Sequence, residues 1–193
     1  MNRWLVFLVG LACGAAAMAI PRGTVALHKA IHGGHHGHGA ADAERVHTEE
    51  RFSFMAQGPM SIVAPLFGAD KERVWAPGWD PKFIYPLPAA DVQGMVFEVA
   101  HSHLKATWVN TQLDWKTGRV QYVYVIPDAL VTVISLQLTA AGDSTRVDVE
   151  YDRTALNAEA DEHVRHMAEG DRGSGPEWEK QVNEYLRQAA SHP

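Results

Sequence analysis

Cysteine and positive charge are both scarce in this sequence. The only cysteine, Cys13, lies in the apolar N-terminal segment, so the rest of the chain cannot form a disulfide, a thiolate metal site or a thiol nucleophile. Lysine and arginine number 17 against 23 acidic residues, which gives a formal net charge of −6. Nucleic-acid binders need a basic surface, and nucleotide binders typically carry a glycine motif that cradles phosphate. The sequence has neither feature, so we expect no nucleic-acid partner.

Long apolar runs are also missing, except at the N-terminus. Arg3 is followed by an uncharged run that reaches Ile20. Ala17 and Ala19 supply the small side chains that signal peptidase needs at positions −3 and −1. We therefore interpret residues 1–19 as a signal peptide cleaved before Ile20, and expect the mature chain to be periplasmic or secreted.

Two alternatives to cleavage remain. An uncleaved anchor would hold the chain in the inner membrane facing the periplasm, because the apolar run lies at the short end of what spans a bilayer. The chain would then contact the membrane through its N-terminal segment. Lipid attachment at Cys13 is the other alternative, although Gly10 stands where the recognition motif normally has leucine.

Residues 20–50 are predicted to be a flexible linker rich in histidine and glycine. Glycine at this density opposes regular structure. Neutral imidazole is a common ligand for Zn²⁺, Ni²⁺ and Cu²⁺, so weak metal binding is expected at His32, His35, His36 and His38. The alternative is a solvated linker without a metal role, because the tract has no fixed ligand count and no supporting second shell. No other cofactor is indicated.

Apolar and polar residues alternate through most of the remaining chain, which predicts strands with one buried face. Thr117-Gly118, Pro127-Asp128 and Gly142-Asp143 have turn chemistry between consecutive segments. Short turns between strands predict an antiparallel meander. The predicted strands span residues 51–57, 95–101, 106–115, 119–126, 130–139 and 145–156.

Helices are predicted on either side of this meander. Two short helices are predicted at residues 60–67 and 69–75, and a longer helix is predicted at residues 158–169. A second C-terminal helix is predicted to begin after Ser174, following a break at residues 170–175. Its apolar residues fall at i, i+4, i+7 and i+8, which is one helix face that can cover the sheet: Trp178, Val182, Tyr185 and Leu186.

Local motifs support a family resemblance. Pro65-Leu66-Phe67-Gly68, residues 72–81 (ERVWAPGWDP) and Thr107-Trp108-Val109 resemble bacterial members of the START-like, or SRPBCC, superfamily. The resemblance covers the predicted domain at residues 51–190. It implies an α+β helix-grip fold, in which a curved antiparallel sheet of six or seven strands wraps around a long C-terminal helix. The break at residues 170–175 departs from the family, in which this helix usually continues.

The resemblance also implies a function. Members hold lipids, polyketides or isoprenoid-like molecules between sheet and helix, so we expect a monomer that binds or transports a hydrophobic small molecule. One alternative is an enzyme resembling polyketide cyclases and dehydratases. Another is a metal-handling envelope protein that acts through the histidine-rich linker.

Polar and aromatic residues near this expected cavity are the candidate site residues. His101 and His103 share a parity and face the same side of a strand. His101 and Tyr124 are the candidate acid–base pair of the enzyme alternative. The alternative for these side chains is a solvated rim, or simple packing for Trp79 at the entrance. The complete set of expected ligand contacts is Trp79, His101, His103, Tyr122, Tyr124, Arg153 and His166.

Overall fold

A computed structural model of the 193-residue chain describes residues 44–101 and 104–191. The elements are, in chain order, β1 (His47–Ala56), α1 (Met60–Val63), the 3₁₀ helices η1 (Ala64–Phe67) and η2 (Lys71–Val74), β2 (Lys82–Tyr85), β3 (Val96–His101), β4 (Leu104–Asp114), β5 (Arg119–Ile126), β6 (Leu130–Ala141), β7 (Ser144–Ala155), α2 (Asp161–Arg172) and α3 (Gly175–Ser191). The predicted strands and helices are therefore present.

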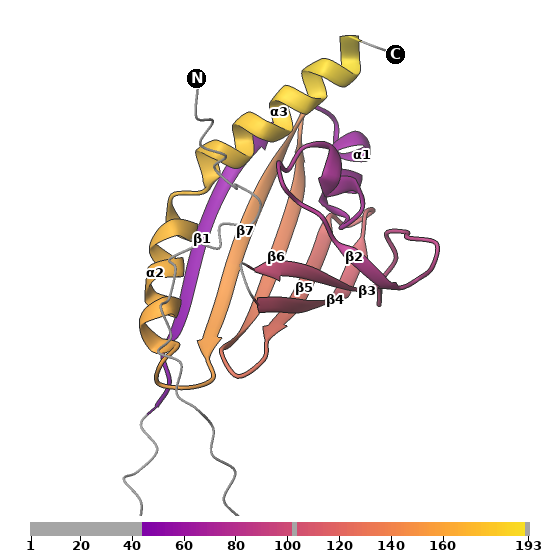
Figure 1. Ribbon diagram of the computed structural model, residues 1–193. Coiled ribbons are helices and arrows are strands. Elements are labelled where there is room, and N and C mark those ends of the chain that lie inside the picture. The colour runs from indigo at the N-terminus through magenta and orange to yellow at the C-terminus, as the bar shows by residue number, and fades with distance from the viewer. Residues whose placement is uncertain (1–43, 102–103, 192–193) are drawn as a thin grey trace, which may run out of the picture.

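All seven strands form one antiparallel sheet, in the order β1-β7-β6-β5-β4-β3-β2. Strands β2 to β7 each pair with their neighbour in sequence, while β1 pairs with the last strand. Gly118 and Gly142 occupy the tight turns predicted from the sequence, both with a positive φ. Figure 1 shows the sheet bending along this order, from β1 beside the C-terminal helices to β2 and β3 at the far edge.

Two details of the strands differ from the sequence prediction. The first strand begins at His47 rather than at residue 51, because its pairing with β7 extends to the His47–Thr154 pair. The end of the predicted linker at residues 20–50 is thus part of the sheet. The rest of that linker and residues 1–19 lie outside the described residues. The edge strand β2 was not predicted at all.

The inner face of the sheet carries the core. Along β5, β6 and β7 every second residue is buried, as expected for strands with one face against a helix layer. On β4 the neighbours Trp108 and Val109 take opposite faces: Trp108 is buried, and Val109 is intermediate. The inner face of the sheet therefore carries large aromatic side chains.

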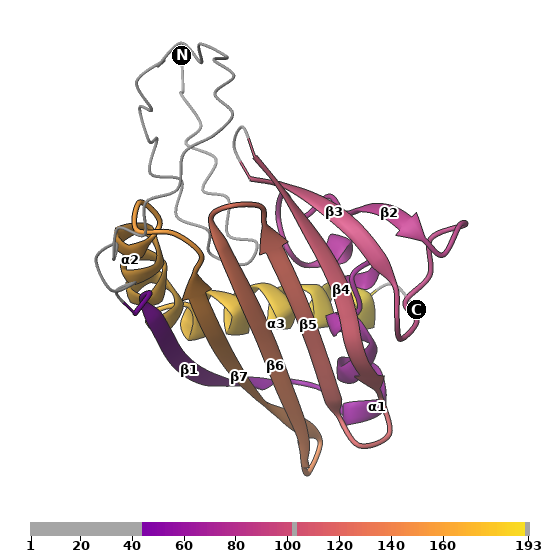
Figure 2. The same cartoon turned by 90° about the horizontal axis from the view of Figure 1, so that it is seen from below.

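The predicted helix break is also present. Helix α2 ends at Arg172, and α3 begins at Gly175. The Ser174 hydroxyl, which lies between the two helices, donates a hydrogen bond to the carbonyl oxygen of Gly170 at 3.0 Å. Figures 1 and 2 show the result: α2 lies beside β1, while α3 runs across one face of the sheet. Within the described residues, none of the helices combines the length and apolar character needed to span a membrane.

Candidate ligand pocket

Aromatic rings fill the space between α3 and the sheet. Trp178 of α3 is at the centre of one cluster, with its ring centroid 5.4 to 6.4 Å from those of Phe52, Phe54, Phe67 and Trp75. The indole N–H of Trp75 donates to the carbonyl oxygen of Leu66 at 2.7 Å. This cluster joins α3 to β1 and to the short helices, as buried aromatic contacts commonly do in cores.

A second aromatic cluster lies further along the sheet. Trp108 stacks on Tyr124 with ring centroids 4.3 Å apart, and on Phe97 at 5.7 Å. Trp79 meets the Trp108 ring edge-on at 5.5 Å, and its N–H donates to the carbonyl oxygen of Ala69 at 2.7 Å. Trp79 is thereby packed over the inner face of β4.

A small pocket lies where the two clusters meet. Its lining is Glu72, Trp79, Phe97, Trp108, Tyr122, Ile134, Leu136 and Trp178. The free volume is about 10 Å³, which is room for a group the size of one water molecule. We call this the inner pocket.

Two polar groups of the inner pocket lack a compensating partner in the described part of the chain: one lacks a hydrogen-bond acceptor, and the other lacks a cation. One is the buried indole N–H of Trp108. The other is the carboxyl of Glu72, on a residue only 5% exposed. Burial, together with the nearby Asp91 carboxylate, raises the pKa of Glu72 well above its usual value. The phenol of Tyr122 differs, because it donates to the carbonyl oxygen of Phe67 at 2.9 Å.

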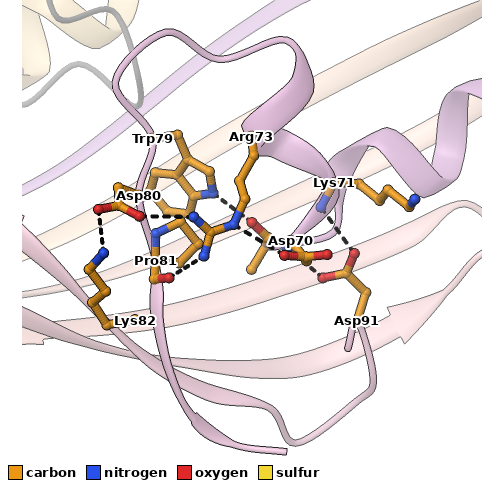
Figure 3. Close-up of polar contacts among 9 residues, drawn as sticks. Asp70, Lys71, Arg73, Trp79, Asp80, Pro81, Lys82 and Asp91 are labelled. Atoms are coloured by element: carbon orange, nitrogen blue, oxygen red, sulfur yellow. Dashed lines mark hydrogen bonds and ion pairs between the residues drawn. The ribbon is translucent and has the colours of Figure 1, made fainter. Parts of the chain in front are cut away.

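A loop between η2 and β2 holds Trp79 over the pocket, and ion pairs brace this loop (Figure 3). The Arg73 guanidinium donates to Asp70 at 3.1 Å, to Asp80 at 2.8 Å and to the carbonyl oxygen of Pro81. Lys82 adds a second cation to Asp80 at 2.6 Å. Trp79 is the most exposed residue of the lining, at 8%. The loop therefore acts as the cover of the inner pocket.

Arg153 is at the centre of a buried polar network near α2. Its guanidinium forms an ion pair with Asp171, donates to the Thr132 hydroxyl at 3.0 Å and reaches the Tyr124 hydroxyl at 3.4 Å. Burial works against the charged guanidinium, yet the oxygens of Tyr124 and Asp171 raise the pKa of Arg153. The pKa of His163 is lowered by burial, by Arg153 and by His166. Because Tyr124 also stacks on Trp108, this network fixes one wall behind the pocket.

A larger hollow, of about 520 Å³, lies on the opposite face of the sheet. Its lining is largely polar, and two of its arginines are paired with acids: Arg51 with Glu150 and Arg146 with Asp148, each at 2.7 Å. A polar, ion-paired surface of this kind does not suit an apolar guest. We therefore place the candidate site in the inner pocket despite its smaller volume.

The structure brings together only part of the predicted site. Trp79 and Tyr122 line the inner pocket, while Tyr124 and Arg153 are buried behind it. His166 does not face this interior: its side chain is 56% exposed on α2 beside Glu169, because it lies on the solvent face of the helix. Of His101 only the backbone at the end of β3 is described, and His103 lies outside the described residues.

The predicted metal ligands His32, His35, His36 and His38 also lie outside the described residues. Where β1 begins, His47, Glu49 and Asp152 place one ligand atom each within 4.8 Å of one another. The His47 ring nitrogen is 2.9 Å from the Thr154 hydroxyl. Exposed acidic groups commonly lie this close together without a metal ion. Metal binding by the linker stays a prediction.

Sequence reasoning missed most of the lining of the inner pocket, including both of its unpaired polar groups, Glu72 and Trp108, and it missed Asp171 behind the pocket. Trp108 was recognised only as part of the motif Thr107-Trp108-Val109. Glu72 belongs to a short helix without apolar periodicity, and Asp171 falls in the region predicted to be a break. Neither position carries a signal in the sequence that separates it from an exposed acid.

No protein-family model and no curated protein matches the sequence. Solved structures do match by fold. Norcoclaurine synthase from Thalictrum flavum is 9% identical with a TM-score of 0.57, over 83% of this chain and 98% of that one. The Zhui aromatase/cyclase from Streptomyces sp. R1128 is 13% identical with a TM-score of 0.55, over 75% and 96%. A protein from Rhizobium loti is 17% identical with a TM-score of 0.50, over 73% and 98%.

Likeness at these identities establishes the fold. The curved seven-stranded sheet, the short helices after β1 and the long C-terminal helix agree with these structures. The chain has the helix-grip fold.

Proposed function

We propose that this protein binds a small hydrophobic molecule in the inner pocket. The observation that carries the proposal is the pairing of an apolar, aromatic lining with two buried polar groups: the Trp108 N–H, which has no hydrogen-bond partner among the described residues, and the Glu72 carboxyl, which has no cationic partner there. Ligand sites commonly combine a mainly apolar wall with a few polar groups that orient the guest.

The unpartnered Trp108 N–H gives an energetic reason for ligand binding. A buried donor without a partner costs about 1–3 kcal/mol, so native proteins leave few of them. A ligand atom that accepts a hydrogen bond from Trp108 would remove this cost. The apolar remainder of the ligand would pack against the surrounding rings.

Entry requires the cover to move. Ligand pockets commonly enclose about 300–1,000 Å³, far more than the inner pocket offers with Trp79 in place. Trp79 lies in a loop, where its own hydrogen bond, the ion pairs of the loop and an edge-on contact with Trp108 hold it. Displacement of this one side chain and its loop would open the pocket toward the surface.

Native mass spectrometry of the full chain, with an organic extract analysed alongside, tests the proposal. We expect a small apolar mass that is lost on denaturation. Replacing Trp108 by phenylalanine keeps an aromatic ring but removes the N–H together with the five-membered ring, so occupancy and affinity should fall about 2- to 10-fold for a ligand that accepts this bond. Arg119→Gln, on the opposite face, is the control and should change neither. A bare protein whose tryptophan fluorescence is unchanged by the extract would refute the proposal.

Catalysis is the second candidate function, and Glu72 is the observation in its favour. A carboxyl that keeps its proton at higher pH can serve as a general acid in an apolar pocket. One structural neighbour is named an aromatase/cyclase. Glu72 suits this role better than the predicted Tyr124, whose hydroxyl lies beside Arg153. Glu72→Gln would then abolish turnover even at ligand concentrations that saturate the variant; unchanged turnover would refute this role.

We further propose that the protein works outside the cytoplasm after removal of residues 1–19. The support is the uncharged run with Ala17 and Ala19 ahead of Ile20. N-terminal sequencing of the protein from an envelope fraction should begin at Ile20. A chain that still begins at Met1 would contradict cleavage.

A further inference from the structure

We propose that the ligand of the inner pocket carries a primary ammonium group, which binds the Glu72 carboxylate among the aromatic rings. This inference rests on the proposed function and specifies the class of its ligand. It predicts an amine with a hydrophobic body rather than a fatty acid or a neutral lipid.

The first argument is the charge balance around Glu72. No cationic side chain within the described ranges contacts its carboxyl. The two cationic side chains of η2 do not pair with Glu72, since Lys71 is exposed and Arg73 is bound to Asp70 and Asp80. The titratable groups that face Glu72 are Asp91 and Tyr122, and neither supplies positive charge.

Asp91 does not compensate for Glu72 either. Its carboxylate accepts hydrogen bonds from the backbone N–H groups of Asp70 at 2.7 Å and Lys71 at 3.2 Å (Figure 3). A buried carboxylate without a cation is costly, and a paired one much less so. A ligand ammonium group would supply the missing counter-charge, whereas a ligand carboxylate would add to the repulsion from Glu72 and Asp91.

The second argument is the composition of the wall. Three tryptophans, Trp79, Trp108 and Trp178, line the same small volume as the carboxyl. Tryptophan is the side chain with the strongest attraction for a cation placed over its ring. A carboxylate enclosed by such rings favours an organic cation over a neutral ligand of the same shape.

The third argument is size. A free volume of about 10 Å³ accepts one group the size of water, and a primary ammonium group has that size. The charged end of the ligand would occupy the inner pocket next to Glu72. Its hydrocarbon body would extend past Trp79, the most exposed residue of the lining.

A matched pair of probes tests the inference: 2-phenylethylamine and 2-phenylethanol, which share size and shape but differ in charge. We expect isothermal titration of the full chain near neutral pH to show at least 10-fold tighter binding of the amine. Glu72→Gln should reduce amine affinity to that of the alcohol and leave alcohol binding unchanged. Glu98→Gln is the matched control, because this carboxylate pairs with Lys105 outside the pocket.

Proton release gives a second readout. Burial raises the pKa of Glu72 and an ammonium partner lowers it, so amine binding should shift the carboxyl toward its ionised form and release protons, while alcohol binding should not. Titrations in two buffers of different ionisation enthalpy measure this release. It should vanish in Glu72→Gln, while Asp91→Asn should retain it if Glu72 is the group that ionises.

The outcomes separate the two proposals. Equal affinity for amine and alcohol, unaffected by Glu72→Gln, would overturn the ammonium inference and leave hydrophobic ligand binding in place. Failure of both probes, together with an empty native mass spectrum, would overturn the proposed function itself.

Discussion

Arg153 and Asp171 form an ion pair that is almost wholly buried, with each side chain 1% exposed. Removing one member leaves the other charge buried without compensation, which typically costs about 3–5 kcal/mol. We therefore expect Asp171→Ala to lower the free energy of unfolding by about that amount. Urea unfolding followed by circular dichroism measures it.

The double variant Arg153→Met with Asp171→Leu separates charge from packing. Replacing a whole buried pair by apolar side chains is often neutral or stabilising. We expect the double variant to be more stable than Asp171→Ala. If it is less stable, the pair contributes net stability, and the charge argument is wrong.

Glu72 should make stability depend on pH in a direction opposite to most acids. The pKa of Glu72 is raised in the folded chain. Its contribution to the free energy of unfolding is therefore fully present below its unfolded pKa of about 4.3 and is lost as pH rises toward the folded pKa. Asp91 acts in the same direction, whereas Glu50, Asp80 and Asp114, whose pKa values are lowered, act in the opposite one. The contributions of these other groups cancel when the stability of the parent protein is compared with that of a Glu72 variant.

We expect Glu72→Gln to be more stable than the parent protein at pH 7, by about 1–3 kcal/mol. The advantage should shrink as pH falls to about 4. Urea midpoints of both proteins at the two pH values measure it. An advantage that does not change with pH would show that the carboxyl is already solvated.

At the scale of single residues, the sequence predicted which way a side chain points better than it predicted which residue that side chain contacts. Strand alternation correctly turns Tyr122, Tyr124 and Arg153 inward. It cannot show that Arg153 meets Asp171, because that contact depends on how α2 lies against β1 and β7. His166 was misplaced for the related reason that a helix face is fixed by packing.

Two glycine turns allow a comparison at the scale of the hairpin. Both have positive φ, where an L-residue costs about 1–2 kcal/mol. A methyl group at Gly142 would meet no atom within 4 Å, while one at Gly118 would lie 2.3 Å from the carbonyl oxygen of Leu138. Gly118→Ala should therefore lower the free energy of unfolding by more than Gly142→Ala. Equal losses would mean that the β4–β5 turn relaxes to remove the contact.

The loop that carries Trp79 should control how fast a ligand enters. Arg73 joins Asp70 and Asp80 across this loop, so Arg73→Gln should loosen it and speed both association and dissociation. Affinity should change less than either rate. Stopped-flow tryptophan fluorescence measures both rates, and Lys105→Gln is the control for loss of an exposed ion pair. Unchanged rates would show that entry follows another path.

Elements with a clear period were predictable. The central strands, the break before α3 and its buried face of Trp178, Val182 and Leu186 all follow from apolar spacing. Strand β2 could not be predicted, because its four residues include no buried residue that would give an alternating apolar pattern. It also has only one partner strand among the described residues. Its pairing comes from tertiary context.

The whole molecule has one continuous core. Residues from β1, the short helices, the remaining sheet and both C-terminal helices belong to a single buried cluster. One core predicts one cooperative unfolding transition. We expect far-ultraviolet circular dichroism and tryptophan fluorescence to give coincident urea curves. Separate midpoints would show that the β2–β3 edge or α2 unfolds on its own.

The pairing of β1 with β7 also sets the order in which the chain can fold. Arg51 and Glu150, bonded across these strands, are 99 residues apart, whereas the other strands pair with immediate neighbours. Contacts between distant residues slow folding, because a long loop must close before they form. While the C-terminal half is still being synthesised, Phe52 and Phe54 have neither their partner strand nor Trp178 to cover them. The first strand is thus the last to be covered, and its apolar side chains stay exposed until the residues that pack on them have been synthesised.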